Sequence, residues 1–212
     1  MNKTIASVFC LLAVGLAACT ISSSAPAAAP AATVVTLDDH ATQLRTDFNR
    51  ARGSVRLLLI VDPACSVCLR GMDDVNGALL AKVDDPRLQT FVVHTSVIGG
   101  EAKDVVPASG LMTNSHVRHY WDPSGNFGRE VSKSLRLKHG AEEVYAWDVW
   151  MVYDAGANLS ANGVPAPALF MHQLPKLRGQ PGRPLLDGDA FAAKARELLA
   201  RLPATARTKQ GG

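Results

Sequence analysis

The fold depends on residues 57–68, which read LLLIVDPACSVC and place an unbroken apolar run directly before two cysteines. A short, continuous apolar run of this kind predicts a strand that is buried on both faces of a parallel or mixed sheet. After the cysteines, apolar residues recur every three or four positions, as is typical of a helix, at Met72, Val75, Leu79 and Val83. The sequence therefore predicts that Cys65 and Cys68 lie where a buried strand passes into a helix.

This position gives the two cysteines distinct chemical roles. A cysteine in the first turn of a helix lies at the positive end of the helix dipole, beside unpaired backbone N–H groups that stabilise its thiolate. A second cysteine three residues later lies one turn further on the same side, close enough to form a disulfide. We therefore expect Cys65 to be an exposed attacking thiol and Cys68 to be a more buried resolving thiol.

Two other interpretations of the cysteine pair stay open. The pair could be half of a zinc site, although zinc requires four ligands and the chain contains no second CxxC pair. It could also be a permanent structural disulfide, although closing a four-residue loop removes little chain entropy. The placement between a strand and a helix favours redox chemistry over both alternatives.

The rest of the chain predicts an α/β domain around this unit. The run Phe91-Val92-Val93 predicts a second strand, so the order strand, helix, strand forms a right-handed crossover. Pro107 and Gly110 indicate loops in a less regular region. Patterning predicts further elements: a helix after Asp38-Asp39, a helix over residues 127–135, strands over residues 147–153 and 168–171, and a final amphipathic helix over residues 187–202.

The N-terminus resembles a lipoprotein export signal. A short positive start and an apolar run over residues 5–18 lead into Leu16-Ala17-Ala18-Cys19, which is similar to a bacterial lipobox. We expect residues 1–18 to be a signal peptide and Cys19 to carry the lipid. Ordinary secretory cleavage nearby is the alternative. By resemblance to lipoprotein sorting, Thr20 after the cysteine favours a periplasm-facing protein on the outer membrane.

The predicted order along the chain is a signal, a tether and one domain. Residues 19–35 comprise the lipidated cysteine and an Ala/Pro/Ser-rich tether, residues 36–204 form the domain, and residues 205–212 form a disordered tail. The chain has 212 residues with a net charge of only +3 and no Lys/Arg runs, which argues against a nucleic-acid partner. If Cys10 is removed and Cys19 is acylated, the domain keeps one dithiol in an oxidising compartment.

The strand, the CxxC pair, the crossover, the Trp121-Asp122-Pro123-Ser124-Gly125 turn and the closing strands and helix together resemble the thioredoxin fold. More narrowly, they resemble the redoxin-type domains of bacterial envelope proteins. The resemblance implies a three-layer α/β/α domain with a central mixed sheet. It also implies a thiol–disulfide oxidoreductase that uses Cys65 and Cys68, without a cofactor beyond its redox-active disulfide. Its partners would be envelope proteins or small thiols and disulfides, with a redox partner protein.

One departure from the resemblance concerns the strand that faces the dithiol. Thioredoxin-like proteins usually begin this strand with a cis-proline, but Ala146, Trp147 and Asp148 occupy that position here. Pro167 fills the role only if the strand order differs. A cis bond before a non-proline residue costs about 3 kcal/mol, so we expect trans bonds here. Trp147 and Asp148 would then border a substrate groove.

The second hypothesis is a thioredoxin-fold module that binds or delivers a soft metal. Thiolates favour soft ions such as Cu(I) or Hg(II), which Cys65 and Cys68 would hold with His94 or His172. By resemblance to thioredoxin-fold copper chaperones, in which three residues separate the cysteines, the two-residue spacing argues against close kinship. His116 and His119 could share a helical face, which is weak evidence for a metal pair.

Overall fold

The computed structural model describes residues 33–161 and 163–203. The predicted signal peptide, the predicted lipid-attachment site Cys19, most of the predicted tether and the tail over residues 205–212 lie outside the described residues. Among those described, no helix has the length and apolar character needed to cross a bilayer.

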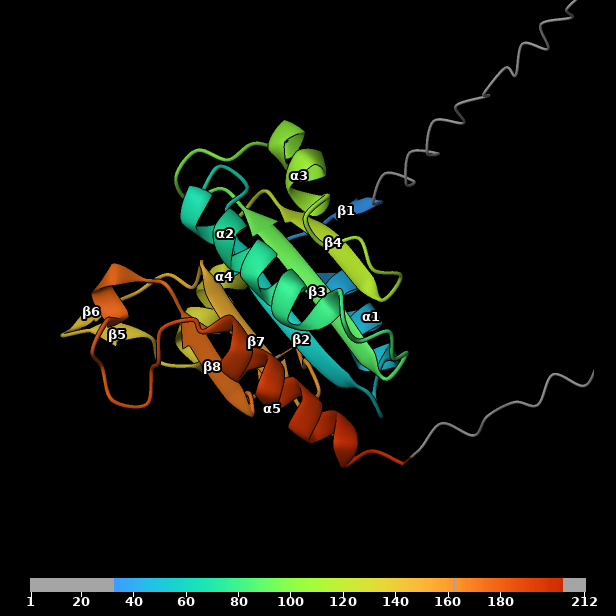
Figure 1. Cartoon of the computed structure of the whole chain (residues 1–212). Coiled ribbons are helices and arrows are strands. Elements are labelled where there is room, and N and C mark those ends of the chain that lie inside the picture. The colour runs from blue at the N-terminus through green and yellow to red at the C-terminus, as the bar shows by residue number, and fades with distance from the viewer. Residues whose placement is uncertain (1–32, 162, 204–212) are drawn as a thin grey trace, which may run out of the picture. The chain divides into compact units, whose positions relative to one another are not determined.

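A six-stranded mixed sheet forms the centre of the described domain (Figure 1), in the order β1-β4-β3-β2-β7-β8. Strands β1, β4, β3 and β2 run parallel, whereas β7 is antiparallel to β2, and β8 is antiparallel to β7. The strands are β1 (Val34–Thr36), β2 (Val55–Val61), β3 (Leu88–Thr95), β4 (Val117–Asp122), β7 (Val149–Tyr153) and β8 (Leu169–His172), with a separate hairpin of β5 (Lys138–His139) and β6 (Glu142–Glu143).

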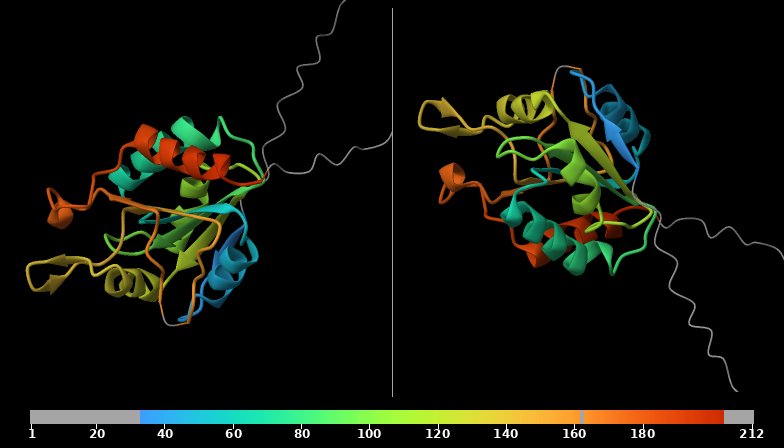
Figure 2. Two further views of the ribbon diagram at one scale, coloured as in Figure 1. Left: turned by 90° about the horizontal axis from the view of Figure 1, so that it is seen from below. Right: turned by 90° about the horizontal axis from the view of Figure 1, so that it is seen from above.

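Helices cover both faces of the sheet and complete the expected three-layer α/β/α arrangement. Figure 2 shows α2 and α5 on one face and α1 and α4 on the other. The helices are α1 (Thr42–Arg50), α2 (Ser66–Val75), η1 (Asn76–Leu80), α3 (Ala102–Ser109), α4 (Asn126–Ser134), η2 (Pro175–Leu177) and α5 (Gly188–Ala200). Here η1 is a π-helical turn that continues α2, and η2 is a short 3-10 turn.

The central strand β2 explains why two separate cores form. Successive side chains of a strand point to opposite faces of the sheet. All seven residues of β2 are buried, so both of its faces are covered. Leu58 and Ile60 join the core under α1 and α4, whereas Leu57, Leu59 and Val61 join the core under α2 and α5. The prediction of a strand buried on both faces is therefore confirmed.

Three parts of the fold differ from the sequence prediction. Helix α3 contains Pro107, which was expected to indicate a loop. Strand β4 includes Trp121 and Asp122, which were expected to lie in a turn. It also includes His119, so His116 and His119 do not share a helical face. Strand β1 begins at Val34, inside the predicted tether, because Val34 and Val35 pair with β4. The two strands are ordered by long-range pairing, whereas α3 begins at a local capping box formed by Glu101 and Asp104.

Candidate active site

The CxxC segment lies at the carboxyl end of the central strand, as predicted. Strand β2 ends at Val61, and α2 begins at Ser66 with Cys65 as its N-cap residue. The Asp62 carbonyl accepts a hydrogen bond from the Cys65 N–H at 3.0 Å, which closes a tight turn between the strand and the helix. Asp62 Oδ1 also accepts from the Ala64 N–H at 2.9 Å. Asp62 therefore fixes the backbone that presents the first cysteine.

Both cysteines are free thiols, and their environments differ. Cys65 Sγ accepts a hydrogen bond from the Cys68 backbone N–H at 3.2 Å, in the manner of a helix N-cap. Cys65 is 5% exposed and Cys68 is fully buried. The expected order of exposure holds, but Cys65 is recessed rather than openly exposed, because it packs within the apolar core under α2 and α5.

A buried carboxylate lies beside the two thiols. The Sγ atoms of Cys65 and Cys68 and a carboxylate oxygen of Asp148 all lie within 4.8 Å of one another. Asp148 directly precedes β7 and adopts a φ of 49°, a left-handed conformation that is uncommon for a residue other than glycine. Its Oδ1 accepts a hydrogen bond from the Trp150 indole N–H at 3.0 Å. The left-handed backbone conformation of Asp148 and the hydrogen bond from Trp150 together hold the carboxylate beside the two thiols.

The electrostatics of this group separate the proton affinities of its members. Burial raises the pKa of Asp148 to about 6, although hydrogen bonds with Trp150 and Cys68 oppose the increase. Burial also raises the pKa of the Cys68 thiol, and the charge of Asp148 and a hydrogen bond with Cys65 raise it further. Cys68 therefore holds its proton strongly, and Asp148 is the carboxylate placed to exchange it.

Asp148 had been expected to line a substrate groove beside Trp147, and its actual location is different. The Asp148 side chain is only 2% exposed, so it lies beneath the dithiol rather than on a surface groove. Trp147 is half-buried and packs against the cores on both sides of the sheet. The described residues contain no cis peptide bond, including those at positions 146–148.

Asp62 also connects the CxxC turn to the loop that follows β3. Its Oδ2 atom accepts hydrogen bonds from the Val97 and Ile98 backbone N–H groups, each at 2.7 Å. At Gly100, a Cβ atom would lie 2.3 Å from Asp62 Oδ1 and 2.7 Å from Pro63 Cδ, so only glycine allows this close approach. The 97–100 loop is therefore fixed against the residues that lead into Cys65.

The two histidines considered as metal ligands lie outside the dithiol group. His94 Nε2 lies 3.1 Å from His119 Nδ1, and His119 Nε2 lies 3.0 Å from the Met112 carbonyl oxygen. Because a carbonyl only accepts, His119 donates to Met112 and accepts from His94. His172 Nδ1 accepts from the Leu174 N–H, and its Nε2 donates to the Arg183 carbonyl. Both candidates therefore have structural hydrogen bonds instead.

Metal binding loses support from this arrangement. The one group of three possible ligands among the described residues is Cys65, Cys68 and Asp148, without either histidine. Two thiols and a carboxylate are suited to proton transfer and disulfide exchange as well as to metal binding. The histidine that the soft-metal hypothesis expects, His94 or His172, does not belong to the group. The soft-metal hypothesis is therefore not favoured.

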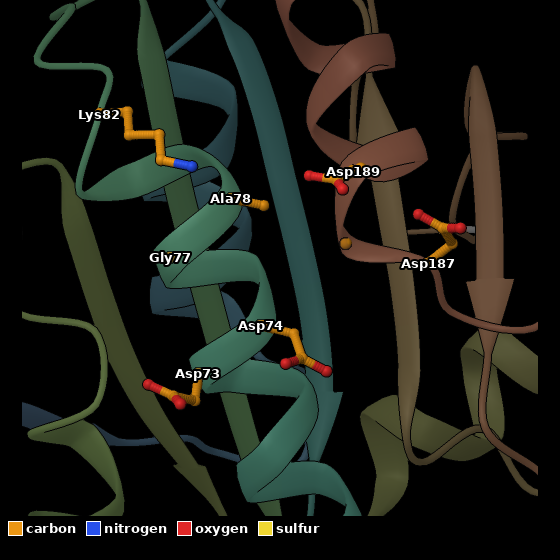
Figure 3. Close-up of a pocket in the computed structure, with 8 residues that line it drawn as sticks. Asp73, Asp74, Gly77, Ala78, Lys82, Asp187 and Asp189 are labelled. Atoms are coloured by element: carbon orange, nitrogen blue, oxygen red, sulfur yellow. The ribbon is translucent and has the colours of Figure 1, made fainter.

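A separate hollow of about 440 Å³ lies between the outer side of α2 and η1 and the beginning of α5. Figure 3 shows that its lining includes four acidic side chains and Lys82. The acidic residues are Asp73, Asp74, Asp187 and Asp189, all of which are exposed. Neither cysteine nor Asp148 contributes to its lining, so this hollow is distinct from the dithiol site.

Comparison with known proteins gives matches among solved structures alone: no family model and no curated protein matches the chain. The first is a secreted disulfide oxidoreductase of Mycobacterium tuberculosis, with 10% identity, a TM-score of 0.39, and coverage of 70% of this chain and 85% of that one. A thioredoxin-family thiol:disulfide interchange protein of Chlorobium tepidum has 9% identity, a TM-score of 0.44, and coverage of 71% and 83%.

An exposed lipoprotein thioredoxin of Streptococcus pneumoniae has 16% identity, a TM-score of 0.37, and coverage of 70% of this chain and 88% of that one. All three names belong to the thioredoxin and disulfide oxidoreductase group. Because each TM-score is below 0.5, the strand order and the position of the CxxC pair, rather than these alignments, support the thioredoxin-like fold of this chain.

Proposed function

We propose that this protein is a thiol–disulfide oxidoreductase whose reacting groups are Cys65 and Cys68. The observation that carries the proposal is the buried carboxylate of Asp148 beside two free thiols at a helix N-terminus. A purely structural disulfide would not need a proton acceptor at its inner sulfur. Exchange chemistry does need one, because the resolving thiol must lose its proton before it attacks.

In the reducing direction, the Cys65 thiolate attacks one sulfur of a substrate disulfide. A bond forms between Cys65 and that sulfur, the substrate S–S bond breaks, and the other substrate sulfur leaves as a thiolate. The Cys68 thiol then transfers its proton to Asp148 and attacks Cys65 Sγ. This step forms the Cys65–Cys68 disulfide and releases the second substrate thiolate, so two electrons have passed from the protein dithiol to the substrate.

The same residues perform the reverse reaction when the protein disulfide meets a substrate dithiol. A partner dithiol or disulfide must restore the starting state after each turnover, and its reduction potential relative to that of the protein sets the direction. In this proposal the reacting groups are the protein's own side chains, Cys65, Cys68 and Asp148.

The direct test is turnover of a disulfide substrate by the protein without its first 19 residues, reduced beforehand. We expect wild type to reduce insulin or a peptide disulfide in the presence of dithiothreitol, and Cys65→Ser to be inactive. Cys68→Ser should accumulate a covalent mixed disulfide at Cys65, visible by mass spectrometry under non-reducing conditions. Ser66→Ala is the matched control, because Ser66 is exposed between the two cysteines. Wild-type turnover equal to that of Cys65→Ser would exclude the proposed activity.

We also propose that the protein works in the bacterial cell envelope, attached to the outer membrane by a lipid on Cys19 and facing the periplasm. The Leu16-Ala17-Ala18-Cys19 sequence and the Ala/Pro/Ser-rich segment after it support this location. Metabolic labelling with a palmitate analogue should label wild type and not Cys19→Ala. Recovery of unlabelled wild type in the soluble periplasmic fraction would contradict the anchor and leave the dithiol chemistry unaffected.

A further inference from the structure

Several exposed apolar side chains belong to the CxxC motif or to the loop that follows β3. The described residues include five large hydrophobic side chains that are markedly exposed: Val67, Val97, Ile98, Val106 and Leu185. Val67 lies between the two cysteines. Val97 and Ile98, at 39% and 53% exposure, belong to the loop that Asp62 holds against the CxxC turn. Three of the five therefore belong either to the CxxC motif or to the loop that is hydrogen-bonded to the turn before Cys65.

The hydrogen bonds of this loop show that its apolar side chains are held in place. One oxygen of the buried Asp62 carboxylate accepts from both the Val97 and Ile98 N–H groups at 2.7 Å. Gly100, which is buried, packs directly on Asp62 and Pro63. A loop fixed in this way loses little conformational entropy when a partner covers it, so its exposed side chains are preorganised for contact.

The recessed position of Cys65 makes such contact necessary. At 5% exposure, its sulfur is reached only by a disulfide that comes close to the surrounding surface. The residues around the approach would then be covered during each exchange. Outside the CxxC motif, Val97 and Ile98 are the exposed apolar side chains on the loop that is hydrogen-bonded to the turn before Cys65.

We propose that Val97 and Ile98 form a docking element for the substrate polypeptide, binding an apolar side chain next to the disulfide that Cys65 attacks. This inference rests on the proposed oxidoreductase function. Three exposed side chains form a patch far smaller than the roughly 800 Å² per partner of a stable complex. The patch therefore suits a transient polypeptide segment rather than a second copy of this chain. A small disulfide without an apolar side chain gains nothing from it.

The test compares two double variants on three substrates. Val97→Ser/Ile98→Ser removes the docking element but keeps the backbone N–H groups that Asp62 binds. Val106→Ser/Leu185→Ser is the matched control, because those side chains are 50% and 43% exposed and lie outside the loop. The substrates are a peptide disulfide flanked by leucines, the same peptide flanked by serines, and hydroxyethyl disulfide.

For the first double variant, we expect kcat/KM on the leucine-flanked peptide to fall by about tenfold, mainly through KM, as expected for the loss of one buried apolar contact. Turnover of the serine-flanked peptide and of hydroxyethyl disulfide should not change, and the control variant should match wild type on all three substrates. Ile98→Ser alone should show a smaller loss in the same pattern, which guards against a folding defect in the double variant.

Three results would overturn the docking element while leaving the dithiol chemistry intact. An equal loss on all three substrates would mean that the loop supports the dithiol rather than the substrate. Unchanged kcat/KM on the leucine-flanked peptide would show that the loop makes no productive contact. Sedimentation that reveals a dimer disrupted by Val97→Ser/Ile98→Ser would assign the patch to self-association. Failure of wild type on every substrate would instead reject the proposed function.

Discussion

Replacing Asp148 by asparagine should stabilise the reduced protein and slow its chemistry. In the folded protein, burial raises the pKa of Asp148 from 3.8 to about 6. The folded state therefore binds this proton more tightly than the unfolded state does. The stability that results is fully present below pH 3.8 and is lost as the pH rises through about 6. At neutral pH the buried charge destabilises the fold, and asparagine removes that charge at nearly constant volume.

The size of the effect follows from the two pKa values. At about 1.4 kcal/mol for each pH unit, the difference between 3.8 and about 6 corresponds to about 3 kcal/mol at pH 8. At pH 4.5, where most of the folded wild type is protonated at Asp148, linkage leaves a difference of about 1 kcal/mol. The stability advantage of Asp148→Asn should therefore grow from about 1 to about 3 kcal/mol between these pH values.

Urea unfolding of the reduced proteins, followed by tryptophan fluorescence, measures this difference. Trp150 donates its indole N–H to Asp148, so it reports on the substituted position. Asp62→Asn is the matched control with the opposite sign. The Asp62 carboxylate accepts three backbone N–H groups, and an asparagine with one acceptor oxygen leaves at least one of them without its acceptor. We expect Asp62→Asn to lose about 1–3 kcal/mol at both pH values.

The kinetic consequence is a slow second step. Without a carboxylate beside Cys68, the mixed disulfide should accumulate and resolve about 100-fold more slowly, within the usual range for the loss of a general base. An Asp148→Asn protein that is less stable than wild type at pH 8, or whose advantage does not change with pH, would refute the account of the buried charge. Unchanged resolution kinetics would refute the proton-acceptor role.

Three further results are expected from the rest of the fold. Gly71→Ala should destabilise the protein by about 1–3 kcal/mol, because its Cβ would lie 2.6 Å from Trp150 Cζ2, whereas Gly77→Ala, with no atom within 4 Å of its Cβ, should change the free energy of unfolding by less than about 1 kcal/mol. Burial and the neighbouring His119 lower the pKa of His94 to about 3, so the unfolded state gains this proton below pH 6.5 and stability falls there. In an Asp148→Asn background, the free energy of unfolding should fall less steeply with decreasing pH below 6.5 when His94 is replaced by leucine, by about 1.4 kcal/mol per pH unit. An unchanged slope would contradict the conclusion that His94 is buried in its neutral form beside His119. A Tyr120→Phe variant should lose about 1 kcal/mol in urea unfolding, because the hydroxyl donates to Asp47 Oδ2 at 3.0 Å inside the core, and a neutral substitution would show that the bond adds nothing.

The sequence predicted those parts of the fold whose signals are local. A continuous apolar run identified β2, apolar residues three and four apart identified α2 and α5, and the two cysteines lay between them as expected. Strand β4 was missed because Arg118, His119 and Asp122 interrupt any apolar run. Its polar residues are accommodated by tertiary partners, such as the hydrogen bond between His119 and His94. Helix α3 was missed because Pro107 suggested a loop, although a capping box at Glu101 and Asp104 begins the helix.

By itself, the sequence determined which residues carry the candidate chemistry, because CxxC spacing and a helix start are properties of neighbouring residues. The tertiary structure alone decided what surrounds them. It placed Asp148, eighty residues beyond Cys68, under the dithiol through the antiparallel pairing of β7 with β2, and it brought the 97–100 loop onto Asp62. Both contacts depend on strand order and on burial, which raises the pKa of a carboxylate only once the chain has excluded water around it.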